Sequence, residues 1–136
     1  CGHGAGALTA DLEAGGGAVY PVDCAGNLHT SVIEYAIRAG AAGVLVLACP
    51  PRDCKNREGP LWLEQRIYHD REAELQARVD RDRVAVGHAA AGDRAVALGA
   101  LHQFQAALTR LVPATVEAGI QVEAVCEPAD EEQVTR

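Results

Sequence analysis

A continuous apolar run at residues 43–49, with the sequence GVLVLAC, constrains the fold more than any other segment. An uninterrupted apolar run with β-branched residues is typical of a strand buried on both faces of a parallel sheet. The apolar stretch that contains it, Ala41–Cys49, has nine residues, whereas a membrane-spanning helix needs about 20. The run therefore predicts a buried strand in a soluble domain with no membrane span.

Strand and helix signals alternate around this run. Residues 17–24 have the pattern of a strand that ends at Cys24, with Pro21 placing it near a sheet edge or at a bulge. Helices are predicted at 28–39, 61–77 and 93–111, a further strand at 83–90, and a weaker edge strand at 120–125. The alternation predicts an α/β fold, a mostly parallel sheet flanked by helices.

Composition and charge fit one small domain. With 136 residues, 49% of them hydrophobic, the chain can bury one core. We expect a domain at 1–112 and a C-terminal extension at 113–136 whose polar end frays. The net charge is −7 and the basic residues are scattered among acids, which disfavours nucleic-acid binding. The chain as given shows no secretory signal, so we expect a cytoplasmic protein.

Five cysteines are an odd number, which argues against a closed set of disulfides and favours thiols kept for chemistry or metal binding. Cys24 and Cys49 each end a predicted strand, and Cys54 lies in the loop that follows Cys49. Cys1 precedes a glycine-rich segment, whereas Cys126 lies in the tail without a motif and is expected to be incidental. Ligands of open α/β sheets bind beyond the carboxyl ends of the strands. We therefore expect the first four thiols to converge on an iron–sulfur cluster or zinc, which both accept thiolate ligands.

Four short motifs follow one another: CAGNL at 24–28, GAAGV at 40–44, ACPPRDC at 48–54 and GPLWLEQR at 59–66. Together they resemble the iron–sulfur (delta) subunit family of methyl-viologen-reducing hydrogenases. That family has a Cys-Ser-Gly-like turn, a Gly-Ala-Asp-Gly-Val-like strand entry, a Gly-Cys-x-x-x-Asp-Cys loop and a Gly-Asn-x-x-x-x-x-Arg segment. Its opening Cys-x-x-Cys corresponds to CGHG at residues 1–4, in which Gly4 replaces the second cysteine.

The resemblance implies an electron-transfer subunit or domain with a [2Fe-2S] cluster on a small Rossmann-like or flavodoxin-like fold. The implied ligands are Cys1, Cys24, Cys49 and Cys54. The implied partners are redox subunits or fused domains with flavin, iron–sulfur or hydrogenase centres, in the cytoplasm or in a membrane-associated complex. The family has a buried strand before its first cysteine. We therefore expect that the first strand is missing from the chain as given, so that the chain is part of a longer polypeptide or lacks its true N-terminus.

Two charged residues are predicted to order the loop that would hold the cluster. Asp53 is expected to cap backbone N–H groups, and Arg66 to pair with Asp53 or Glu58. The pattern contains no nucleophile–base pair, so no substrate-converting site is expected.

Other interpretations remain open. Gly4 is compatible with a zinc-stabilised or cluster-free scaffold domain that mediates complex assembly. A thiol–disulfide enzyme using Cys49 and Cys54 is disfavoured, because their spacing is not Cys-x-x-Cys. His3 is either a solvated loop histidine or a substitute ligand.

Overall fold

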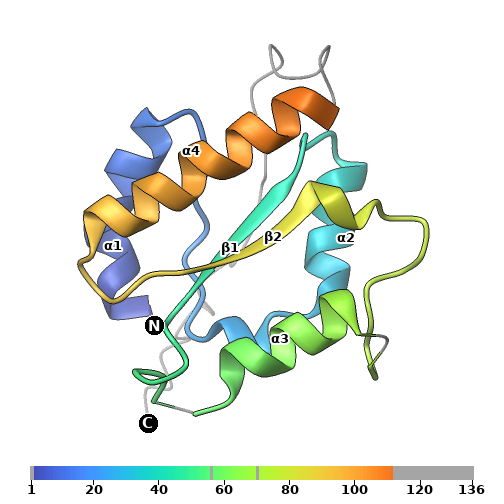
Figure 1. Cartoon of the computed structure of the whole chain (residues 1–136), viewed down its shortest axis with the longest axis horizontal. Helices are drawn as coiled ribbons and strands as arrows, with labels where there is room; N and C mark the ends of the chain where they lie inside the picture. Colours follow the sequence, from blue (N-terminus) through green and yellow to red (C-terminus); the bar gives the residue numbers. More distant parts are fainter. Residues whose placement is uncertain (1, 56, 70, 112–136) are drawn as a thin grey trace, which may run out of the picture.

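The computed structural model describes residues 2–55, 57–69 and 71–111, with side chains from Leu8 onward. These residues form helices, two strands and two short 3-10 helices (Figure 1). In chain order the elements are α1 (Gly2–Ala14), η1 (Ala25–Asn27), α2 (Thr30–Arg38), β1 (Val44–Ala48), α3 (Gly59–Tyr68), η2 (Arg81–Arg83), β2 (Val84–His88) and α4 (Arg94–Leu111).

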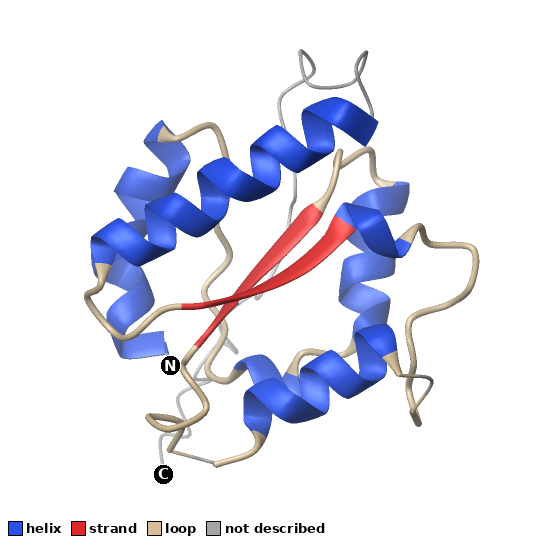
Figure 2. Ribbon diagram, viewed as in Figure 1, coloured by secondary structure: helices blue, strands red, loops and turns tan. Residues whose placement is uncertain are grey.

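The two strands of the described region pair in parallel, from Val44 opposite Val84 to Ala48 opposite His88. Helices cover both faces of this small sheet, with α1 and α4 on one side and α2 and α3 on the other (Figure 2). The predicted strands at 43–49 and 83–90 are confirmed, and so is the general prediction of parallel strands flanked by helices.

Side chains along β1 point alternately to the two faces of the sheet, which divides the core into two sides. Val46 and Ala48 pack with residues of α2 and α3, whereas Leu45 and Leu47 pack against the cluster formed by α1 and α4. The α2 and α3 side is the more tightly closed, because Leu63 is 0% exposed while Leu101 of α4 is 8% exposed. Strand residues that point alternately to two covered faces explain why the run at 43–49 contains no polar position.

Residues 17–24 form a loop between α1 and η1, so the prediction of a strand there is wrong. Pro21 has no backbone N–H to donate to a ladder, and residues 21–23 are exposed. Cys24 therefore does not end a strand. It lies immediately before the short turn of η1.

The helix predicted at 61–77 begins at Gly59 and ends at Tyr68, so the predicted C-terminal half is wrong. The described residues of 71–79 form a loop in place of that half. The sequence contains no helix breaker in this segment, so the helix end must come from tertiary contacts.

Helix α2 supplies those contacts. Thr30 Oγ1 donates to the Ala73 carbonyl at 2.8 Å, and Arg78 Nη2 donates to Glu34 Oε2 at 3.0 Å. Leu75, between the two contacts, is 0% exposed. A non-helical loop can bury Leu75 and satisfy the Thr30 hydroxyl together, which overrides local helix propensity.

The remaining helix predictions at 28–39 and 93–111 are confirmed by α2 and α4. Cys1, Cys126, the predicted strand at 120–125 and the extension at 113–136 lie outside the described residues. Within the described part of the chain, every helix is too short or too polar to cross a membrane.

Candidate thiol site at the end of the sheet

Two buried cysteines face the same small space beside the first residue of α3. Cys24 and Cys54 are 7% and 6% exposed, and both are thiols. Their sulfurs lie 3.2 Å and 3.6 Å from the position that a Cβ would take on Gly59. Gly59 has no side chain, so it leaves open the space that both sulfurs border.

A close contact between two glycines brings the cysteines together. A Cβ on Gly26 would lie 2.5 Å from Gly59 Cα and 3.0 Å from the Gly59 carbonyl oxygen, which real structures do not tolerate. The η1 turn and the start of α3 therefore pack backbone against backbone. This contact places Cys24, two residues before Gly26, next to α3.

A pocket of about 320 Å³ opens beside Cys24 and Gly59. It is lined by Cys24, Gly26 and Asn27 of the turn and by Gly59, Trp62 and Arg66 of α3. The three α3 residues are spaced by three and four positions, which places them on one face of the helix. The pocket thus lies between that face and the turn that follows Cys24.

Arg66 ties the two walls of the pocket together. Its Nη2 donates to the Gly26 carbonyl oxygen, which links α3 to the η1 turn. Its Nε is buried and has no hydrogen-bond partner among the described residues. Within the same residues Arg66 makes no ion pair with Asp53 or Glu58, so it orders the turn after Cys24 and not the loop before Cys54.

The outer rim of the pocket is held by Trp62. Its Nε1 donates to Glu58 Oε2 at 3.0 Å, and the Arg71 guanidinium lies 3.5 Å from the centre of its ring. A cation over an indole face is an attractive contact. Glu58 is therefore engaged by Trp62, which explains why it does not serve as the predicted partner of Arg66.

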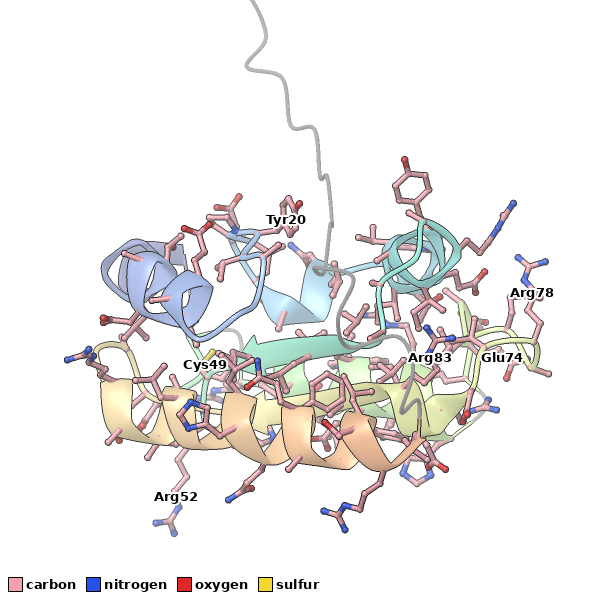
Figure 3. All side chains as sticks on the ribbon, turned by 90° about the horizontal axis from the view of Figure 1, so that it is seen from above. Tyr20, Cys49, Arg52, Glu74, Arg78 and Arg83 are labelled. Carbon is pink, nitrogen blue, oxygen red and sulfur yellow. The ribbon has the colours of Figure 1, made fainter. Side chains whose placement is uncertain are left out.

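Backbone hydrogen bonds order the loop between β1 and α3. The Asp53 N–H donates to the Pro50 carbonyl at 2.9 Å, which closes a turn whose second residue is Pro51. Proline is favoured at this turn position because its fixed φ matches the turn. The Asp53 backbone closes the turn, whereas we predicted that the Asp53 side chain would cap it. Arg52, at the turn, projects away from Cys49 (Figure 3).

Cys49 follows the last residue of β1 and is partly exposed. Its carbonyl oxygen lies 3.2 Å from His88 Nδ1, and His88 Nε2 lies 2.8 Å from Glu64 Oε1. His88 therefore joins the ends of both strands to α3. His88 was not among the predicted site residues, although its place at the carboxyl end of a strand is the same signal that singled out the cysteines.

Of the four predicted ligands, the structure brings Cys24 and Cys54 together and places Cys49 at the start of the loop that contains Cys54. In the part of the chain that the structure describes, no three His, Cys, Asp or Glu side chains converge closely enough to hold a metal ion. The described site is thus a two-thiol site. Two thiols that border one space can bind a soft metal centre.

The chain was also compared with known proteins. The sequence model of one family, described as FlpD: Methyl-viologen-reducing hydrogenase, delta subunit, matches residues 10–112. A comparison with curated proteins finds no match. The matched region contains Cys24, Cys49, Cys54 and the whole pocket.

Proposed function

Because the chain belongs to the methyl-viologen-reducing hydrogenase delta subunit family, we propose that it is the electron-transfer component of a hydrogenase-type complex and holds a [2Fe-2S] cluster. The observation that carries the cluster assignment is the convergence of the buried Cys24 and Cys54 thiols over Gly59. When bound, such a cluster supplies a one-electron relay.

The donor chemistry fits this proposal. Iron–sulfur clusters take thiolate ligands, and two thiols already border a space that any side chain on residue 59 would enter. We propose Cys49 and Cys1 as the other two ligands. Cys49 begins the loop that ends near Cys54, and Cys1 lies outside the described residues.

The other residues of the site hold these ligands in place. Gly26 and Gly59 set the approach of the Cys24 turn to α3, and Arg66 fixes it by its bond to the Gly26 carbonyl. His88 holds the end of β1 through the Cys49 carbonyl. The chain thus supplies a rigid frame on one side and a short loop on the other.

We extend the proposal to the fold and the partners. Two parallel strands with helices on both faces are compatible with part of a Rossmann-like or flavodoxin-like sheet. The partners would be redox subunits or fused domains with flavin, iron–sulfur or hydrogenase centres. Thiols without disulfides among the described cysteines support a reducing compartment, the cytoplasm.

Anaerobic purification followed by absorption and low-temperature EPR spectroscopy tests the cluster. We expect the reduced protein to give a [2Fe-2S] signal that is lost in Cys24→Ser and in Cys54→Ser. Cys126→Ser is the matched control and should keep the signal, because Cys126 lies outside the matched family region.

A colourless protein that contains stoichiometric zinc and gives no signal after anaerobic reconstitution with iron and sulfide would overturn the proposal. It would favour the zinc-stabilised scaffold. A protein that keeps full cluster content in Cys54→Ser would refute the ligand assignment while leaving the family assignment intact.

A further inference from the structure

Arg66 carries a hydrogen-bond donor that the described structure leaves unused at the wall of the thiol pocket. Its Nε is buried without a partner among the described residues, although the Nη2 of the same guanidinium donates to the Gly26 carbonyl. A buried donor without an acceptor destabilises the folded state. Such groups need an explanation, and one explanation is an acceptor that is present only in the working protein.

The shape of the guanidinium indicates where that acceptor lies. The group is planar with its N–H bonds in a fixed fork, and Nε and Nη2 share one edge of it. The donor without a partner therefore lies beside the donor that holds the turn at Gly26. Cys24 is two residues before Gly26 and lines the same pocket as Arg66.

We propose that Arg66 Nε donates a hydrogen bond to the Cys24 sulfur when that sulfur is an anionic ligand, an inference that rests on the proposed function. Arg66 is then a positioning residue: its Nη2 holds the turn at Gly26, and its Nε stabilises the Cys24 thiolate. A hydrogen bond from a charged donor is stronger than a neutral one. Because reduction adds negative charge to the site, such a donor favours the reduced state.

The first test compares the wild-type protein with Arg66→Lys, which keeps the positive charge and removes the planar fork. We expect the reduction equilibrium, measured by an EPR-monitored redox titration, to shift about tenfold toward the oxidised state, or about 59 mV for one electron. An exchangeable-proton coupling to the reduced cluster, seen by ENDOR spectroscopy before and after transfer to D₂O, should be lost in Arg66→Lys.

Arg83→Lys is the matched control. Arg83 lies at the amino end of the strands and donates hydrogen bonds from the same two nitrogens to backbone carbonyls. Its Nε donates to the Ala42 carbonyl at 2.7 Å, and its Nη2 donates to the Ala41 carbonyl at 2.6 Å. Its replacement should lower stability and leave the potential and the proton coupling unchanged. A potential in Arg66→Lys that equals the wild-type value would overturn the inference and leave the cluster proposal standing.

A second measurement decides the inference if no cluster is present or if Arg66→Lys loads no cluster. In the metal-free protein, Arg66 should speed the alkylation of Cys24 by iodoacetamide at fixed pH, since the thiolate is the reactive form. We expect the alkylation rate of Cys24, relative to that of Cys54, to fall about tenfold in Arg66→Gln. An unchanged ratio in Arg66→Gln would refute the hydrogen bond.

Discussion

An arginine lies at each end of the sheet, and the two arginines differ in their hydrogen bonding. At the amino end, Arg83 directs Nε and Nη2 to the carbonyls of Ala42 and Ala41, so both donors on that edge are satisfied. At the carboxyl end, Arg66 directs Nη2 to the Gly26 carbonyl and has a buried Nε without a partner in the described region. Figure 3 places Arg83 and Cys49 at opposite ends of the strands.

Packing also differs between the two ends of the sheet. At the amino end, a Cβ on Gly43 would lie 2.7 Å from both the Arg83 carbonyl oxygen and Leu108 Cδ2, so that end is filled. At the carboxyl end, the space over Gly59 is bordered by two sulfurs, and a pocket of about 320 Å³ adjoins it. The amino end is therefore closely packed, while the carboxyl end has an open pocket and a buried donor without a partner in the described region.

The largest effect is expected from Gly26→Ala. The new Cβ would meet Gly59 Cα at 2.5 Å, and backbone cannot move aside as a flexible side chain does. We expect a loss of about 3 kcal/mol in the free energy of unfolding, the upper range for overpacking, together with loss of cluster content. Urea denaturation and iron analysis measure the two effects.

Two other glycines are controls for this variant. Gly43→Ala clashes at the opposite end of the sheet and should lower stability without lowering the iron content of the folded protein. Gly99→Ala, inside α4 with no atom within 4 Å of its Cβ, should be neutral or stabilising by up to about 1 kcal/mol. Equal stability of Gly26→Ala and Gly99→Ala would contradict the backbone contact.

Arg83→Lys should give the next largest effect. A lysine cannot satisfy the Ala41 and Ala42 carbonyls with a planar fork, so we expect a loss of about 2 kcal/mol in the free energy of unfolding. Urea denaturation measures this loss. If the variant were as stable as the wild-type protein, the amino end would not depend on this contact.

Gly59→Ala should separate stability from metal binding. Position 59 is the first residue of α3, and its new Cβ would lie 3.2 Å from the Cys24 sulfur. We expect a stability change below about 1 kcal/mol and a fall of about tenfold in bound iron, because the methyl group occupies the space between the thiols. Cluster content equal to that of Gly99→Ala would show that the cluster lies elsewhere.

The smallest expected effect is the pH dependence of stability that comes from Tyr68, at the end of α3. Burial raises the pKa of Tyr68 above 10.0, the Val86 backbone hydrogen bond opposes this, and the Glu64 carboxylate adds to it. The folded protein therefore holds the phenol proton more tightly than the unfolded chain does. The contribution of Tyr68 to stability should be fully present below pH 10.0 and should be lost as the pH rises through its raised pKa.

Tyr68→Phe provides the comparison for that decline. Thermal unfolding at a series of alkaline pH values should show a shallower loss of stability in the variant than in the wild-type protein. The difference is expected to be small, because Tyr68 is 41% exposed. Identical pH profiles would mean that burial does not raise the pKa of the Tyr68 phenol in the folded protein.

The sequence predicted the elements whose signals are local. The strand in the apolar run at 43–49 and the helix at 93–111 form as expected. A continuous apolar run and an apolar stripe of helical period are both patterns of residues that are near one another in the sequence. The end of α3 was not predictable in this way. It depends on Thr30 and Glu34, which lie about forty residues earlier and hold the loop at 71–79.

The candidate site was also only partly predictable from the sequence. The loop with Cys49 and Cys54 could be located from the strand before it, but the strand before Cys24 does not form. Cys24 reaches Cys54 because Gly26 packs on Gly59, and contact between two distant glycines leaves no periodic signal in a sequence. The partner of Arg66 was missed for the same reason, since it is a backbone carbonyl of that turn.

The Gly26–Gly59 contact also bears on how such a site can change over evolutionary time. The contact is made by main-chain atoms, so the approach of the Cys24 turn to α3 does not depend on which side chains surround it. A loop residue such as Arg52, whose side chain projects away from Cys49, can then be exchanged without altering the approach of the Cys24 turn to α3. Lineages would be free to vary the outer surface of the loop without altering the buried contact between the turn and the helix.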